Sequence, residues 1–348
     1  MRLEPIAAPS HARTLVPPAI AIAATIAVAG LLAAMAGANP LHTFGLIVKG
    51  AFGSKFALLE TLNRATPLIF TGLAVAVAFR ARLWNIGAEA QLYAGALLTV
   101  LIGTQLGLPG PLAIPLMALG AVIAGALLLL GPVLLKTRLG VDEVVTTLLL
   151  NFVMALFISY LLEGPLKDPM GMGWPKSPSL PRDARLPRIV DGLRLHWGFA
   201  LALICAAGVW VIQTRTTLGY EIRAVGANPQ AARFAGIPVT ATLVKTALLS
   251  GGLAALAGFS EVAGLKGNLT TDLSASFGYT GIVVAMLALL HPLGVVVSAL
   301  FVAGIFVGAD SMSRAAQVPT YIADLLLASA LLFMVLAVLL TRFRVVRG

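Results

Sequence analysis

Long apolar runs alternate with short polar segments along most of the chain. Most runs are close to the roughly 20 apolar residues that a helix needs to cross a bilayer. The pattern therefore predicts an all-α, polytopic helical membrane protein with about ten transmembrane segments. The runs lie near residues 18–36, 58–79, 87–106, 111–135, 144–162, 197–213, 241–264, 280–290, 293–309 and 321–341.

Two of the runs are unusual, and one sequence recurs. The runs 280–290 and 293–309 are short and flank His291-Pro292, which predicts a broken or half-length pair of helices inside the protein. The hexapeptide at 71–76 (TGLAVA) returns at 280–285 as TGIVVA. Internal repeats with broken helices are typical of transporters, although chance similarity is the alternative in a chain so rich in Ala, Val and Gly.

Composition excludes an ordinary soluble domain. Of 348 residues, 59% are apolar and 11% charged, and the mean hydropathy is +0.96. The formal net charge of +10 comes from basic residues in loops and at the ends of apolar runs, so we expect no nucleic-acid partner. Cys205 is the only cysteine, which excludes a disulfide framework. The run 18–36 is read as a retained first span, with a signal peptide cleaved near 36–38 as the alternative.

Ten crossings with both termini in the cytoplasm place the basic clusters on the inner side, as the positive-inside rule requires. On this count the segment 164–195 is an external loop. The region 214–240 is then a cytoplasmic loop, and its basic, Ala/Gly-rich character indicates a docking surface for a soluble partner. The inner clusters are Arg13; Arg80 and Arg82; Lys136 and Arg138; the region 214–240; and Arg342, Arg344 and Arg347.

Small residues recur four apart in the run 241–264. Ala247, Gly251 and Ala255 form one stripe, and Ser250, Ala254 and Gly258 form the adjoining one. Small residues at this spacing let helix backbones approach closely in lipid, so we expect a tight helix contact here.

Polar residues inside the apolar runs are the candidates for a solute pathway, because burying them in hydrocarbon is costly unless they are paired or line water. In 82–93 (RLWNIGAEAQLY) these are Asn85, Glu89 and Gln91. They either line the pathway or form a capping cluster, in which Asn85 caps a helix and Glu89 pairs with Arg82.

Three further candidates lie along one face of the run 144–162, namely Thr146, Thr147 and Asn151. Their hydroxyl and amide groups could bind a neutral polar solute, or they could form hydrogen bonds between helices. Glu261 is the last candidate, with outward snorkelling or pairing with Lys266 as alternatives.

No catalytic motif is present. The four histidines have no metal-ligand spacing, and neither G-x-S-x-G nor H-E-x-x-H occurs. The segment 131–137 lacks the glycine that precedes the lysine of a phosphate loop. We therefore expect a non-catalytic protein that uses no metal or cofactor.

Five segments, in order, resemble the membrane permeases of bacterial ABC importers of the branched-chain amino acid and simple-sugar type, with nucleoside-uptake permeases the most similar. They are 83–96 (LWNIGAEAQLYAGA), 141–153 (VDEVVTTLLLNFV), 163–181 (EGPLKDPMGMGWPKSPSLP), 218–237 (LGYEIRAVGANPQAARFAGI) and 278–294 (GYTGIVVAMLALLHPLG). Ala90 and Leu289-Leu290-His291 depart from the usual pattern. The resemblance implies a single permease domain over 1–348, with an ABC importer permease fold, in the bacterial cytoplasmic (inner) membrane.

The resemblance also implies partners and a coupling surface. A separate cytoplasmic ATPase, a second permease subunit and an extracytoplasmic substrate-binding protein or lipoprotein are expected. In such permeases the segment matching 218–237 forms short coupling helices with a glycine at their turn, here Gly226. Independently, Asn228-Pro229 favours a helix start at Pro229. The coupling residues are Glu221, Arg223, Gly226, Asn228, Ala231, Ala232, Arg233 and Gly236.

The sequence thus predicts uptake of a small polar solute, most simply a nucleoside, by an ABC importer. A simple-sugar or branched-chain amino acid permease is the nearest alternative. An ion-coupled secondary transporter would place ionisable residues in mid-membrane, whereas the acids here lie near the ends of the runs. An integral membrane enzyme lacks a catalytic constellation.

Overall fold

The computed structural model describes residues 39–190 and 192–316, together with 2–5, 343–346 and scattered positions between 20 and 34 and between 321 and 336. The predicted spans 18–36 and 321–341 are therefore described only in part, and Arg13, Arg342 and Arg347 lie outside the described residues. The fold is all-α apart from two strands, β1 (Arg2–Pro5) and β2 (Phe343–Val346), which pair antiparallel.

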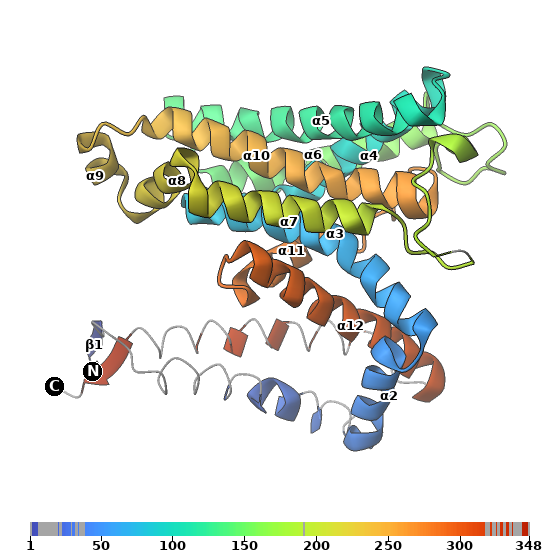
Figure 1. The fold of residues 1–348 in the computed structure, drawn as a ribbon, viewed down its shortest axis with the longest axis horizontal. Helices are drawn as coiled ribbons and strands as arrows, with labels where there is room; N and C mark the ends of the chain where they lie inside the picture. Colours follow the sequence, from blue (N-terminus) through green and yellow to red (C-terminus); the bar gives the residue numbers. More distant parts are fainter. Residues whose placement is uncertain are drawn as a thin grey trace. The chain divides into compact units, whose positions relative to one another are not determined.

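Eleven α-helices follow one another through the described residues (Figure 1). They are α2 (Pro40–Phe52), α3 (Lys55–Arg80), α4 (Ala88–Gln105), α5 (Gly110–Leu139), α6 (Glu143–Glu163), α7 (Gly198–Arg215), α8 (Thr217–Ala227), α9 (Pro229–Phe234), α10 (Val239–Ser260), α11 (Phe277–Leu287) and α12 (Pro292–Ala316). A 3₁₀ turn, η1 (Arg182–Ala184), and a π-helical turn, η2 (Glu261–Lys266), complete the set.

Six of these helices are long and apolar enough to cross a membrane, namely α3, α5, α6, α7, α10 together with η2, and α12. The multi-pass helical fold is thereby confirmed, while the total of ten spans stays a prediction. The helix α4 is not one of the six; it carries the polar residues Glu89 and Gln91 in its first turns, and most of its residues are buried.

The chain divides into two compact units, residues 62–301 and a smaller unit of residues 1–61 and 302–348. In the smaller unit, α2 packs against the end of α12. A Cβ added to Gly308 would lie 2.4 Å from the carbonyl oxygen of Ile47, so only glycine allows this approach. The Thr61 hydroxyl donates a hydrogen bond of 2.9 Å to the Ala51 carbonyl and fixes the turn between α2 and α3.

The core of the larger unit is formed by α4, α5 and α10, and Figure 1 shows α5 and α10 side by side. The predicted small-residue stripes lie at these contacts. A Cβ on Gly251 would come within 2.2 Å of the Gly125 carbonyl oxygen, and a Cβ on Gly258 within 1.9 Å of the Leu92 carbonyl oxygen. The close helix approach expected from the sequence is confirmed, and it occurs within the chain.

The chain breaks where the proline turn was predicted, between α11 and α12. Leu289 and Leu290 adopt left-handed backbone angles, with φ of 50° and 60°, and Pro292 begins α12. The prediction of two half-length helices is right for α11 and wrong for α12. The latter is 25 residues long, because the helix continues beyond the apolar run through Asp310 and Arg314 to Ala316.

Candidate functional site

The predicted polar residues at the start of α4 converge on a buried hydrogen-bond network. Asn85 donates through Nδ2 to Gln91 Oε1 and Ser250 Oγ, both at 3.0 Å, and its Oδ1 accepts from the Gly87 N–H at 3.0 Å. The Ser250 hydroxyl in turn donates a hydrogen bond of 2.7 Å to the Ala74 carbonyl oxygen. The turn between α3 and α4 is thereby tied to α10.

Helix α6 contributes a second part of the network. The Asn151 side chain accepts from the Ala90 N–H and donates to the Ile86 carbonyl and the Tyr279 hydroxyl, all at 2.9–3.0 Å. Thr147 accepts from the Ile86 N–H at 3.3 Å. Thr146 faces elsewhere, since its hydroxyl bonds only to carbonyls of its own helix, and it is separate from the cluster.

Glu89 joins α4 to α11. Its Oε2 accepts a hydrogen bond of 2.7 Å from the Gly278 N–H, in the first turn of α11. Ser276 at the N-cap adopts φ 59° and makes no side-chain capping bond, while the Ser274 hydroxyl accepts a hydrogen bond of 3.0 Å from the Phe277 N–H. The Glu89 carboxylate adds a second cap from another helix, where the dipole favours negative charge. The alternative pairing of Glu89 with Arg82 is wrong, and Asn85 is not the N-cap of α4; that position is Gly87, whose N–H donates to the Asn85 side chain.

The two copies of the recurring hexapeptide face each other. Thr71 Oγ1 donates to the Phe277 carbonyl at 3.0 Å, and a Cβ on Gly281 would lie 2.6 Å from Thr71 Oγ1. A Cβ on Gly72 would likewise meet Val284 at 2.8 Å. The small residues of both copies thus allow α3 and α11 to cross closely.

Glu261 lies apart from the network. It begins η2 with only 3% of its surface exposed, so it does not snorkel outward. Lys266 and Arg64 are the cations that interact electrostatically with the Glu261 carboxyl group. The Lys266 Nζ donates at 2.8 Å to the Asp272 carbonyl.

Two short helices, α8 and α9, occupy most of the segment predicted to couple to a soluble partner. The Asn228 side chain accepts from the N–H groups of Gln230 and Ala231 at 2.9 and 3.1 Å, so the helix start at Pro229 is confirmed. Helix α9 ends at Phe234, and Gly236, just after its C-cap, has a left-handed φ of 82°. Ala231 and Arg233 are exposed and Ala232 is buried.

The predicted role of Gly226 as the turn is wrong. Gly226 is buried inside α8, where a Cβ would lie 2.0 Å from the Arg80 carbonyl oxygen, and the chain turns at Asn228 instead. Glycine is needed for this close approach rather than for a positive φ. Arg223 bonds to the Gln213 carbonyl, and Glu221 accepts from the Thr242 hydroxyl at 3.1 Å. These contacts fix α8 to α3, α7 and α10.

Sequence reasoning missed Phe234, which ends α9 with 95% of its surface exposed. The available signal was an aromatic residue inside a polar segment, next to the predicted surface residue Arg233. A protruding aromatic of this kind is typical of a protein interface.

The arrangement pairs a polar, hydrogen-bonded interior with a protruding helical surface. The family described as the branched-chain amino acid transport system permease component matches residues 57–338. The chain belongs to this permease family. The permease is 35% identical to the guanosine ABC transporter permease of Bacillus subtilis, with 91% of each chain covered.

Two further relatives have different solutes in their names. The glucose ABC transporter permease of Haloferax volcanii is 35% identical, with 94% of the permease and 89% of that protein covered. The nucleoside ABC transporter permease of Lactococcus lactis is 30% identical, with 87% and 85% covered. The matched region contains the buried network, α8, α9 and the break before α12.

Proposed function

We propose that the permease is the membrane subunit of an importer for a nucleoside, driven by ATP hydrolysis in a separate cytoplasmic subunit. The observation that carries the solute class is the similarity to the guanosine and nucleoside permeases over most of the chain. Uptake of a free sugar is the second candidate, favoured by the equally high identity to the glucose permease.

The surface of α8 and α9 supports the ATPase partnership. Arg233 and Phe234 are exposed at the end of α9, while Glu221, Arg223 and Gly226 attach α8 to the membrane helices. A soluble subunit bound to Arg233 and Phe234 would therefore move α8 together with the end of α3. With this surface in the cytoplasm, the segment 164–195 and the other ends of α7 and α10 face outward.

A second permease, identical or different, would complete the pathway, and an extracytoplasmic binding protein or lipoprotein would deliver the solute. Both chain termini would then lie in the cytoplasm. The side chains of Asn85, Gln91, Thr147 and Asn151 are already bonded within the protein, so their contribution is to hold the helices around the pathway. A direct contact of these residues with solute stays a prediction.

Competition for uptake in cells that carry the whole transporter tests this proposal. Excess unlabelled nucleosides should suppress the uptake of labelled guanosine, whereas leucine should not. Suppression by glucose alone would favour the second candidate. Suppression by leucine alone would contradict both.

A further inference from the structure

A polar, non-helical stretch of the larger unit, residues 267–276, runs from η2 to α11. Its later part bonds to the first turns of α4. The Tyr93 hydroxyl donates to the Thr271 carbonyl at 2.7 Å and accepts from the Ser274 N–H at 3.3 Å. The Glu89 carboxylate accepts from the Gly278 N–H, just after the stretch. The far end of α4 meets the segment 164–197, where a Cβ on Gly103 would touch Leu180.

Helix geometry sets the depth of this stretch. Ten residues separate Tyr93 from Gly103, which at 1.5 Å per residue corresponds to about 15 Å along α4. The stretch starts beside residues 176–180 of the segment 164–197, where Thr270 pairs with Lys176, and its later part, residues 271–276, continues below them toward Tyr93 and Glu89. Irregular backbone at membrane depth is stable only where it is buried in protein or lines a water-filled cavity. Four residues of the stretch are exposed rather than buried in protein, so we take this backbone to line a water-filled cavity. They are Thr271, Asp272, Ala275 and Ser276.

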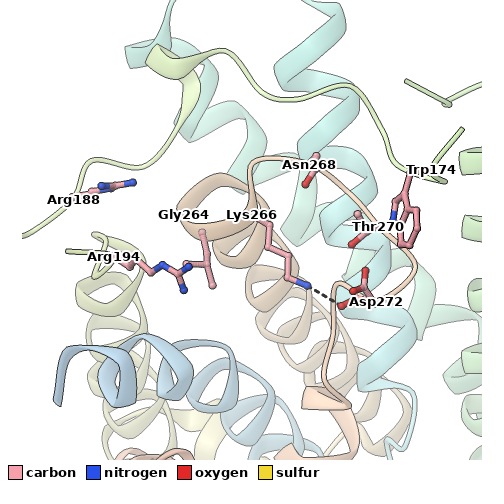
Figure 2. A pocket seen from close by; sticks show the side chains of 9 residues that line it. Trp174, Arg188, Arg194, Gly264, Lys266, Asn268, Thr270 and Asp272 are labelled. Carbon is pink, nitrogen blue, oxygen red and sulfur yellow. Dashed lines mark hydrogen bonds between the residues drawn. The ribbon is translucent and has the colours of Figure 1, made fainter. Parts of the chain in front are cut away.

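A cavity of about 610 Å³ opens at the upper end of the stretch, and this volume suits a small molecule. Figure 2 shows Trp174, Thr270 and Asp272 on one side of it and Arg188 and Arg194 on the other, with Lys266, which is bonded to Asp272, between them. Trp174 is 69% exposed and offers a flat apolar ring. The neighbouring Thr270 side chain and the Lys266 ammonium hold the pKa of Asp272 below its usual value, so this carboxyl is ionised at neutral pH.

We infer that Trp174, Asp272 and the stretch 271–276 form a solute-binding site for a neutral, ring-shaped compound rich in hydroxyl groups. An ionised carboxylate accepts hydrogen bonds from hydroxyls, and an aromatic ring packs against a sugar or a base. This inference rests on the proposed import of a polar solute and assigns the residues that contact it.

Two carboxylates disfavour a solute carboxylate or phosphate at the lower end of the site, although three cations line the cavity above it. Glu89 already occupies the Gly278 N–H at the start of α11, which is the group that would otherwise attract an anion. An anionic solute would also meet the carboxylate of Asp272, and like charges repel. The Lys266 ammonium is bonded to the Asp272 carbonyl, and Arg188 and Arg194 lie across the cavity from Trp174.

Cysteine labelling tests the site. Ala275→Cys and Thr271→Cys, each with Cys205→Ser, are assembled with the ATPase subunit in lipid nanodiscs and treated with a charged methanethiosulfonate reagent. Both should react, because their positions face water. Ala155→Cys is the matched control. Ala155 is equally exposed in the middle of α6, but we expect it to face lipid, so its cysteine should not react.

Protection by solute identifies the ligand. Guanosine or glucose at ten times its dissociation constant should slow labelling of Ala275→Cys about tenfold, through simple occupancy. Protection by guanosine alone would assign the nucleoside, and protection by glucose alone the sugar. Labelling at neither position, labelling that neither solute slows, or protection by leucine or AMP would overturn the inference. The labelling experiment needs no ATP and tests only the binding site. The proposed function is tested separately, by uptake in the wild-type transporter, and uptake that does not depend on ATP would contradict it.

Discussion

The carboxylate of Glu89 caps the first turn of α11 by accepting a hydrogen bond of 2.7 Å from the Gly278 N–H, across 189 positions of sequence. The contact leaves no room for a larger residue at 278, where a Cβ would lie 2.3 Å from the Glu89 nitrogen. Together with Tyr93 and Asn151, it attaches the start of α11 to α4 and α6. The start of the short helix after the non-helical stretch is therefore capped both by Ser274 of that stretch and by Glu89 from another helix.

Replacing Glu89 by Ala should destabilise the permease by about 1–3 kcal/mol, because it leaves the buried Gly278 N–H without an acceptor. Thermal unfolding of the purified protein in detergent measures the change. Glu163→Ala is the control, since Glu163 is exposed at the end of α6. Equal unfolding temperatures for the two variants would show that the cap is dispensable.

Glycines on α5 should differ sharply in their tolerance of alanine. In Gly125→Ala the added methyl would meet the Gly251 carbonyl oxygen at 2.2 Å, so overpacking should cost about 1–3 kcal/mol. Gly131 has open space around it, and Gly131→Ala should be neutral or stabilising by up to about 1 kcal/mol. The unfolding temperatures of both variants check this ordering, and the reverse order would contradict the α5–α10 contact.

Much of this helix packing was predictable from the sequence. Small residues four apart and an Asn-Pro helix start are recognised from neighbouring residues alone. The role of Gly226 was not. A sequence shows that glycine is present but not whether it serves a left-handed turn, as Gly236 does, or a close approach, as at the Arg80 carbonyl. The partners of Glu89 and Asn151 were equally hidden, because they lie on helices that only the fold brings together.

Loss of the protruding aromatic on α9 should weaken attachment of the ATPase subunit. Phe234→Ala should cost about 2 kcal/mol or more of binding free energy, as expected for an interface anchor, and leave the unfolding temperature unchanged. Co-purification of the ATPase with the tagged permease provides the measurement. Tyr160→Ala is the control, because Tyr160 is 65% exposed near the opposite end of the larger unit. Undiminished co-purification of the Phe234→Ala variant would refute this role.

His196 should make folding stability depend on pH. The side chain is 1% exposed in a slot between Gly198 and Gly264, and burial lowers the pKa of His196 to about 4. The unfolded chain, with a pKa near 6.5, binds the proton more readily, so stability is complete above about pH 6.5 and falls as the pH drops toward 4. Unfolding temperatures measured across this range should show the decline. The His196→Asn variant should lack this component, and an identical pH profile for it would assign the decline to other groups.

ATP-driven uptake in proteoliposomes tests the central claim most directly. The permease is reconstituted with its ATPase, the second permease subunit and the solute-loaded binding protein, and labelled guanosine is followed into the lumen. The account predicts accumulation only when ATP reaches the ATPase, and none when a hydrolysis-deficient ATPase replaces it. Accumulation without ATP, driven by an imposed proton gradient, would contradict the account.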